Sequence, residues 1–199
     1  MSRAFDVDYI YEDREGMRVI TGLSRGRRLV TPAGLDVRPT ADNVKESVFS
    51  IIQFSVEGRR FLDAFAGSGQ MGIEALSRGA ASAVFIDSSK QSLDAVKKNL
   101  AATGLEKNAR IVKGDTLAYL SSCGECFDIA FLDPPYKTGL LQSALELMPA
   151  VMSKSGIVIC EHPADELLPE ETGRFRLKKN YKYGRIMISV YSDKDVEGL

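Results

Sequence analysis

From residue 61 onward, short apolar runs alternate with amphipathic stretches along the chain. The apolar runs have the length of strands and lie at 61–65, 83–87, 110–113, 128–132 and 157–161. Between them, apolar residues at helical spacing predict helices at 71–78, 89–103, a short one ending at 120, and 140–152. Strands and helices that alternate in this way form a parallel sheet with helices on both faces.

The alternation stops near the end of the chain. Residues 175–181 and 185–191 predict two strands joined around Lys182-Tyr183-Gly184, which is a hairpin. We therefore predict an α/β fold with a Rossmann-like, seven-stranded, mostly parallel sheet and an antiparallel C-terminal strand.

A different pattern precedes the sheet. Residues 17–29 predict a small N-terminal β-hairpin extension that turns at Ser24-Arg25-Gly26. Thr40 or Asp42 can cap a following helix, whose apolar stripe begins at Val44.

Composition narrows the class of protein. With 199 residues, 44% of them hydrophobic, the chain can form one globular domain with a small appendage. It has neither a membrane-length apolar run nor the apolar segment of a signal peptide, and it has only 3 cysteines, so we expect a cytoplasmic protein. Cys123-Gly124-Glu125-Cys126 lacks a second ligand pair, so we expect a surface loop there and no metal. We expect His162 in a loop after a strand.

Positive charge is concentrated although the net charge is −1. One basic segment follows residue 17, and a second lies between 174 and 185. Such segments indicate a local polyanion-binding face, although solvated charged surfaces would show the same composition. The residues predicted to contact a nucleic acid are Arg25, Arg27, Arg28, Lys178, Lys179, Lys182 and Arg185.

Asp133-Pro134-Pro135-Tyr136 follows the apolar run 127–132. Ligands of open α/β sheets bind at the carboxyl ends of strands, where this tetrapeptide is expected. The prolines stiffen the turn and lack N–H donors, which leaves carbonyls that can accept hydrogen bonds. A fixed acceptor pair beside an aromatic ring suits a flat, amino-bearing ring such as a nucleobase, although an ordinary strand-ending turn has the same composition.

The loop 63–72 joins the first sheet strand to its helix and contains a GxGxxG match, Gly67 to Gly72. Gly67 and Gly69 allow close backbone approach to a nucleotide. Three aspartates end the first three strands: Asp63 can meet an ammonium group, Asp87 ribose hydroxyls and Asp115 an adenine edge. This acidic lining favours S-adenosylmethionine over a pyrophosphate-containing cofactor, while helix capping would also explain Asp87 and Asp115. The predicted cofactor-binding residues are Asp63, Phe65, Ala66, Gly67, Ser68, Gly69, Asp87, Ser88, Asp115 and Thr116.

Taken in order, these motifs resemble those of class I S-adenosylmethionine-dependent amino-methyltransferases. The segments 18–22, 25–27 and 38–42, the last leading into 46–49, resemble the bacterial RsmD family more specifically. The resemblance runs from about Met17 to the end of the tail hairpin, with Asp87 where glutamate is frequent and Tyr136 where phenylalanine can occur. It implies methylation of the exocyclic N2 of a guanine in 16S ribosomal RNA, and it adds Arg38 and Thr40 to the cofactor site.

Under this resemblance the catalytic residues are Asp133, Pro134, Pro135 and Tyr136. We expect a flexible acidic extension (1–16), an RNA-binding appendage of hairpin and helix (17–57) and a class I methyltransferase domain (58–199). The expected partner is 16S ribosomal RNA or the assembled small ribosomal subunit, bound by a monomer without membrane or metal. An adenine-N6 methyltransferase acting on DNA or RNA remains an alternative, because it shares the Asp-Pro-Pro-Tyr box, as does a catalytically silent, cofactor-dependent RNA-binding assembly protein. The acidic lining disfavours a dehydrogenase.

Overall fold

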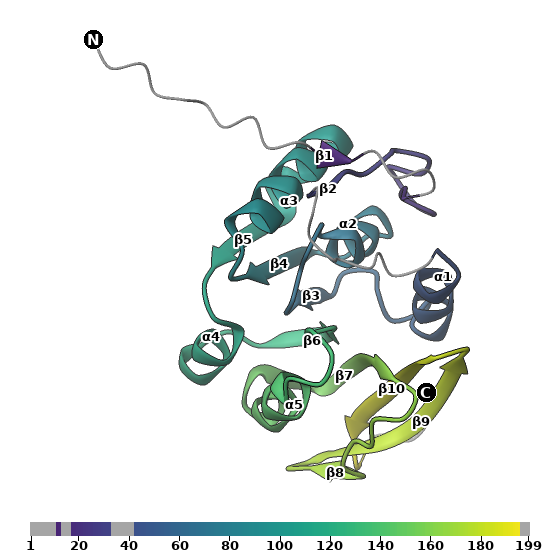
Figure 1. Ribbon diagram of the computed structural model, residues 1–199, viewed down its shortest axis with the longest axis vertical. Coiled ribbons are helices and arrows are strands. Elements are labelled where there is room, and N and C mark those ends of the chain that lie inside the picture. Colours follow the sequence, from purple (N-terminus) through teal and green to yellow (C-terminus); the bar gives the residue numbers. More distant parts are fainter. Residues whose placement is uncertain (1–10, 13–16, 33–41, 196–199) are drawn as a thin grey trace.

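The computed structural model describes residues 11–12, 17–32 and 42–195, which form a mixed sheet with helices on both faces (Figure 1). Within these residues the main sheet has eight strands. Their order is β5 (Ala109–Lys113), β4 (Ser82–Asp87), β3 (Arg60–Asp63), β6 (Phe127–Leu132), β7 (Met152–Pro163), β10 (Ile186–Asp193), β9 (Phe175–Tyr183) and β8 (Glu171–Thr172). The strands from β5 to β7 pair in parallel, and β10 is antiparallel to both β7 and β9.

The predicted α/β fold is therefore confirmed, including the antiparallel C-terminal strand. The strand beyond the predicted set is β8, which has 2 residues and pairs with β9. An element this short cannot produce a periodic pattern in the sequence.

Alternating strand residues fill two separate cores, one on each side of the sheet. One face packs under α1 (Asp42–Ile51), α2 (Gln70–Ser77) and α3 (Lys90–Thr103), and the other under α4 (Thr116–Ser122) and α5 (Leu140–Val151). Along β6, Ile129 and Phe131 enter the first core, whereas Ala130 and Leu132 enter the second. Because successive strand side chains point to opposite faces, apolar runs without polar alternation are what this two-sided burial requires.

The helix ends follow local sequence signals. Ser89 caps α3 by accepting from the Ser92 N–H, and Gly104 ends the same helix in the left-handed conformation, as its sequence predicts. The short helix η1 (Glu106–Asn108) then leads into β5. Among the described helices, none is long and apolar enough to cross a membrane.

Strand β7 is longer than predicted, and it corrects the expectation that His162 lies in a loop. The strand extends to Pro163 because β10 pairs with it through Ile186↔Pro163 and Met187↔His162. His162 is buried, and its Nε2 lies 2.7 Å from the Ser189 hydroxyl oxygen on β10. Long-range pairing thus turned a predicted loop into sheet.

The predicted N-terminal hairpin is present, with an antiparallel bridge between Arg18 and Arg28. The Val19 N–H donates to the Arg27 carbonyl (2.9 Å), and the Leu29 N–H to that of Met17 (2.9 Å). Met17, Val19 and Leu29 are buried in the same core as α1 to α3. Near it, β1 (Tyr11–Glu12) pairs with β2 (Thr31–Pro32). Arg38, Thr40 and most of 1–16 lie outside the described residues.

Buried polar side chains fasten this hairpin to α2 and α3. The Glu74 carboxylate on α2 accepts from the backbone N–H groups of Ile20 (2.7 Å) and Thr21 (3.0 Å). Asn99 on α3 accepts from the Val30 N–H and donates to the carbonyls of Val30 and Ser68, each at 2.8 Å. Since Ser68 belongs to the glycine loop, the hairpin directly supports the predicted cofactor site.

Candidate active site

The loop between β3 and α2 turns through glycines. Gly67 and Gly69 have φ values of 53° and 76°, a region that favours glycine. Gly72, one turn into α2, packs against β4 so closely that an added Cβ would lie 2.3 Å from Cε1 of Phe85. The three glycines of the GxGxxG match thus serve two turning positions and one close helix–strand contact.

Two carboxylates hold this loop in place. The Gly72 N–H donates to Oδ2 of Asp63 (2.9 Å), and the Gly67 N–H donates to Oδ2 of Asp87 (2.9 Å). Oδ1 of Asp87 also accepts from the Ser89 N–H (2.8 Å), beside the exposed Ser88. The predicted residues Asp63 and Asp87 therefore meet at the loop, each at the carboxyl end of its strand.

Asp63 is the more deeply buried of the two, with 2% of its surface exposed. Burial raises the pKa of Asp63 to about 7, and the Asp87 charge adds to the rise, while the Gly72 N–H opposes it. Burial also raises the pKa of Asp87, against the hydrogen bonds from Ser89 and Gly67. A cation placed here would favour the ionised carboxylates, so the lining fits a positively charged cofactor.

The end of β5 contributes less directly. Asp115 is exposed and caps α4, since its Oδ1 accepts from the Ala118 N–H (2.8 Å). The capping alternative is thus realised for Asp115. The adjacent Thr116 is buried and donates from its hydroxyl to the Ala64 carbonyl (2.6 Å), which ties the start of α4 to the loop after β3.

The same loop also spans the neighbouring strand ends. Its backbone N–H groups bind on both sides: Ala64 donates to the Phe131 carbonyl on β6 (3.1 Å) and Ala66 to that of Ile86 on β4 (2.8 Å). Phe65 between them is half-buried against the α4–α5 core. The glycine loop and the end of β6 consequently share one edge of the sheet.

Asp133-Pro134-Pro135-Tyr136 leaves β6 at this edge. Asp133 is half-buried; burial first, then the charges of Glu161 and Asp63, raise its pKa well above the ordinary range. Pro134 is buried, whereas 38% of Tyr136 is exposed. Of the proline carbonyls expected to accept hydrogen bonds, that of Pro135 accepts from the Thr138 hydroxyl (2.7 Å).

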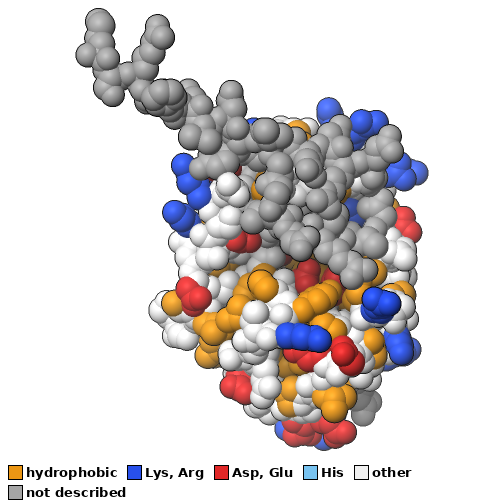
Figure 2. All heavy atoms as spheres, in the orientation of Figure 1, with side chains coloured by type: hydrophobic (Ala, Val, Ile, Leu, Met, Phe, Trp, Pro, Cys, Tyr) orange, Lys and Arg blue, Asp and Glu red, His pale blue; other side chains and the backbone are white. Residues whose placement is uncertain are grey.

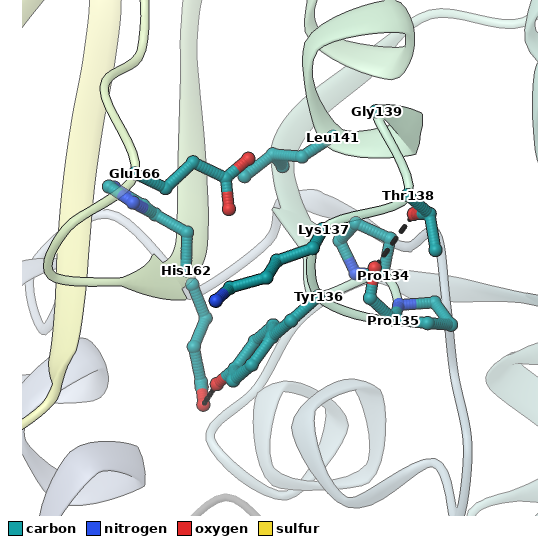
Figure 3. A pocket seen from close by; sticks show the side chains of 10 residues that line it. Pro134, Pro135, Tyr136, Lys137, Thr138, Gly139, Leu141, His162 and Glu166 are labelled. Atoms are coloured by element: carbon teal, nitrogen blue, oxygen red, sulfur yellow. Dashed lines mark hydrogen bonds between the residues drawn. The ribbon is translucent and has the colours of Figure 1, made fainter.

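A hollow opens beside this turn. It is lined by residues 134–139, by Leu141 of α5, and by Glu161, His162 and Glu166 in and after β7. Figure 3 shows Tyr136 and Lys137 extending side by side toward β7, with the Tyr136 hydroxyl at the dashed hydrogen bond to Oε1 of Glu161. Lys137 has a positive φ of 61°, and such conformations in non-glycine residues are concentrated at functional sites. The sequence pattern predicts the turn and its ring but not this opposite wall.

Glu161 is a site residue that sequence reasoning missed. It ends the apolar run of β7 with 3% of its surface exposed, and the Tyr136 hydroxyl donates to its Oε1 (3.4 Å). The register of β6 and β7 places it next to the last pair, Leu132↔Cys160, beside the position of Asp133. An acid that follows an apolar run at a strand end was the available signal, as it was for Asp63.

The predicted nucleic-acid contacts fall at two places. The end of β9 carries Lys182, and the turn that follows it carries Arg185. Both side chains are exposed, and the pairing Ile186↔Pro163 puts this turn at the carboxyl end of β7. Lys179 lies farther along β9, exposed and 4.9 Å from the Tyr181 ring centre, and Lys178 is half-buried.

The arginines of the N-terminal hairpin lie elsewhere. Arg25, Arg27 and Arg28 are exposed, and the tip beside them is anchored by Ser24, whose N–H donates to Oγ of Ser77 (3.0 Å) and whose hydroxyl donates to the Thr103 carbonyl (2.9 Å). Ser77 and Thr103 end α2 and α3, helices that begin at the Asp63 edge. The tip therefore lies at the far end of these helices. On the face in Figure 2, many Lys and Arg side chains lie near the margin, while acidic side chains occur both among the apolar ones in the middle and at the margin.

Cys123 and Cys126 are half-buried free thiols beside the start of β6, at the edge opposite Asp133. They take no part in the hollow described above.

Comparisons with known proteins agree with this arrangement. Residues 17–192 match the model of the family described as "Conserved hypothetical protein 95". The Escherichia coli (strain K12) protein "Ribosomal RNA small subunit methyltransferase D" is 33% identical over 177 residues, which cover 88% of this chain and 89% of that protein. A protein of the same name from Haemophilus influenzae is 36% identical over 135 residues, covering 66% of this chain and 70% of its own.

Solved structures give the same result. The Escherichia coli protein described as "Putative methyltransferase yhhF" superposes with a TM-score of 0.78 at 31% identity, covering 89% of this chain and 97% of its own. The fold is also shared, at 14% identity and a TM-score of 0.63, with SMU.776, whose structure was determined as a complex with SAH; the match covers 73% of this chain and 48% of that one. The family resemblance stated from the motifs is confirmed by these matches.

The contact at Gly72 leads to a first prediction. Gly72→Ala should lower the free energy of unfolding by about 1–2 kcal/mol, because overpacking against Phe85 outweighs the gain of about 1 kcal/mol in helix propensity. Gly114→Ala is the matched control, since no atom lies within 4 Å of its added Cβ. It should be neutral or stabilising by about 0.5 kcal/mol. Urea unfolding of both variants is the measurement, and an equal effect at the two glycines would contradict this account of the packing.

The buried carboxyl of Asp63 leads to a second prediction, which concerns the pH dependence of stability. The folded protein keeps its proton up to about pH 7, whereas the unfolded chain loses it near the ordinary pKa of 3.8. The unfolded state therefore binds fewer protons between these values, so stability falls as the pH rises from about 4 to about 7.

Asp63→Asn removes this dependence while keeping an acceptor for the Gly72 N–H. Relative to the variant, the wild type should lose stability of the order of 4 kcal/mol across that pH range and no more above about pH 8. Urea unfolding at several pH values tests it. A wild-type-to-variant difference that does not change with pH would rule out a proton held by Asp63.

Proposed function

Because the chain belongs to the family described as "Conserved hypothetical protein 95", with relatives named as small-subunit ribosomal RNA methyltransferases, we propose that it is an RNA methyltransferase. It transfers a methyl group from S-adenosylmethionine to the exocyclic N2 amine of a guanine in small-subunit ribosomal RNA. The carrying observation is that Asp133 and Asp63 meet at one edge of the sheet, closely enough for their charges to interact. The proposed setting is the cytoplasm, with the RNA free or in an assembling subunit.

The residues that would hold the cofactor are those of the glycine loop and the neighbouring strand ends. Asp63 offers a buried carboxylate for an ammonium group, and Asp87, Ser88, Asp115 and Thr116 line the ends of β4 and β5. When bound, S-adenosylmethionine supplies an electrophilic methyl group attached to a positively charged sulfur. The raised pKa values of Asp63 and Asp87 support this assignment, because a cation is what relieves crowded carboxylates.

Asp133 and the Pro134 carbonyl orient the nucleophile. An exocyclic amine is a weak nucleophile, since its lone pair is delocalised into the base. Two acceptors on its N–H groups pull the nitrogen toward a tetrahedral shape and direct the lone pair toward the methyl carbon. Asp133 then accepts the proton that the nitrogen loses as the N–C bond forms, and its raised pKa favours that transfer. Most of the rate enhancement comes from orientation and fixed charge.

Tyr136 provides the surface on which the base stacks. Its ring is partly exposed on the hollow, and the stiff double proline fixes the turn that carries it. The target base must leave any stack, at a cost of a few kcal/mol that is lowest in loops and bulges. This favours an unpaired guanine as the substrate.

Basic residues bind the surrounding RNA at two places. Lys182 and Arg185 stand at the same sheet edge as Asp133, where they can contact phosphates next to the flipped base. The arginines of the N-terminal hairpin extend the contact along α2 and α3. Helix α3 alone has 14 residues, or about 21 Å, so the proposed footprint covers more than the target nucleotide.

The catalytic assignment predicts the effect of Asp133→Ala. Methyl transfer should fall by at least about 10³-fold because both the aligning acceptor and the proton acceptor are lost. Cofactor affinity should change little. The measurements are transfer of labelled methyl to small-subunit RNA and calorimetric titration with S-adenosylhomocysteine. Glu170→Ala, an exposed acid remote in sequence from the loop, is the control. Wild-type turnover in Asp133→Ala would overturn the assignment.

The basic turn predicts a change in salt dependence. Replacing Lys182 and Arg185 with glutamine should weaken RNA binding and reduce the slope of log affinity against log salt concentration by about 1 to 2. The control is Lys154→Gln, at an exposed lysine near the start of β7, which should leave the slope unchanged. Fluorescence anisotropy with a labelled RNA fragment measures both variants. If the Lys182 and Arg185 variant has the same slope as the control, the turn is not part of the RNA surface.

A further inference from the structure

Glu161 lines the hollow beside Pro134, Pro135 and Tyr136. It lies on β7, the strand next to β6, one position beyond the registered pair Leu132↔Cys160. Its carboxylate accepts from the Tyr136 hydroxyl, and its charge acts on Asp133. The residue therefore faces the proposed base-binding position from the side opposite the glycine loop.

The placement is energetically costly without a ligand. Only 3% of the Glu161 surface is exposed. Burial first, and then the charges of Glu161 and Asp63, raise the pKa of Asp133. Like-charged carboxylates in a partly desolvated site destabilise one another. A ligand that presents hydrogen-bond donors to both Asp133 and Glu161 would offset that cost.

Guanine has such an edge. Its N1–H and N2 amine are adjacent donors that point the same way, and ionised carboxylates are acceptors. Adenine has an acceptor at N1 beside its N6 amine, so a carboxylate near N1 would face a lone pair. Both bases have an exocyclic amine that Asp133 could hold. The neighbouring ring nitrogen N1, a donor in guanine and an acceptor in adenine, distinguishes them.

We propose that Glu161 selects guanine, by accepting a hydrogen bond from N1–H while Asp133 and the Pro134 carbonyl hold the N2 amine. This inference rests on the proposed function and assigns base choice to a residue outside the Asp-Pro-Pro-Tyr turn. Glu161 is positioned by β7 and by burial, and the Tyr136 hydroxyl adds only a long hydrogen bond of 3.4 Å to Oε1.

A purely supporting role for Glu161 makes a different prediction. If Glu161 served only to position the Tyr136 ring, then removing the hydroxyl in Tyr136→Phe would have the same consequence as Glu161→Gln. Both changes would lower turnover equally for every base. Under our proposal the two variants differ, because Tyr136→Phe keeps the acceptor that reads N1–H.

The test uses two RNA fragments that differ only at the target, which carries guanine or 2-aminopurine. 2-Aminopurine keeps the exocyclic 2-amine but has an acceptor at N1. Wild-type enzyme should prefer guanine in kcat/KM by about 10²-fold or more, since buried acceptors without donors reject the analogue. Glu161→Gln, whose amide can donate to N1, should bring the two substrates to within about 10-fold. Tyr136→Phe should keep the wild-type ratio.

Binding provides a second readout that does not need turnover. With S-adenosylhomocysteine present, the affinity ratio of the two fragments is measured by competition, and 2-aminopurine fluorescence reports entry of the base into the site. Glu161→Asp keeps the charge but draws it back by one methylene, so its ratio should lie between those of wild type and Glu161→Gln. If Glu161→Gln fails to fold, as thermal unfolding would show, the Glu161→Asp ratio decides.

The outcomes separate this inference from the proposed function. A wild type that binds RNA but transfers no methyl to guanine overturns the proposed function. A guanine preference that persists unchanged in Glu161→Gln and Glu161→Asp, in turnover and in binding, overturns the role of Glu161 and leaves the proposed function intact. A fall in the ratio in Tyr136→Phe equal to that in Glu161→Gln assigns base choice to the ring.

Discussion

The site depends on two carboxylates at strand ends that fix one loop by accepting hydrogen bonds from its backbone. Asp63 accepts from the N–H of Gly72, and Asp87 accepts from that of Gly67, so the loop is fixed at both ends from neighbouring strands. Backbone bonds to Phe131 and Ile86 then set its path across the sheet edge. The position of α2, which begins at the end of the loop, follows from this hold. The position of the N-terminal hairpin depends on the same loop, because Asn99 donates to the carbonyls of both Ser68 in the loop and Val30 in the hairpin.

This arrangement gathers carboxylates at a part of the sheet edge where burial limits their solvation by water. Asp63 and Glu161 are buried, and the pKa of Asp133 between them is raised by its own burial first and then by their charges. Packing alone does not require acids here, because apolar residues would fill the same space at lower cost. These acids therefore lower the stability of the fold and raise its affinity for cations and hydrogen-bond donors. A cationic cofactor on the Asp63 side and an amine-bearing base on the Glu161 side would relieve opposite ends of the same repulsion.

The sequence pattern predicts the sheet because strands such as β6 are buried on both faces and are therefore apolar throughout. It predicts most helices because their ends have local signals, such as Ser89 and Gly104 for α3. It fails where pairing is long-range. β7 extends to His162 and Pro163 only because β10, more than 20 residues later, pairs with them. Likewise, the anchoring contacts of Glu74 and Asn99 have no local pattern, because their backbone partners lie 54 and 69 positions away. The candidate site was predictable at the turn and the loop, and Glu161 was missed because its meaning comes from the strand beside it.

The sheet order also explains how one short chain can join chemistry to RNA binding. From β3, through β6 and β7, to β10, each step moves about 4.8 Å along the same edge. The steps carry, in turn, Asp63, Asp133, Glu161 and the basic turn beside Arg185. A nucleobase is wider than one step, so a base at Asp133 has room to contact the end of β7, the next strand, as well. The antiparallel β10 is what brings the turn after β9 back to this edge; a parallel strand in its place would begin at the opposite edge. The charge along the edge thus changes from acidic to basic over two strands, and the proposed function places the reacting amine on the acidic side and the phosphates on the basic side.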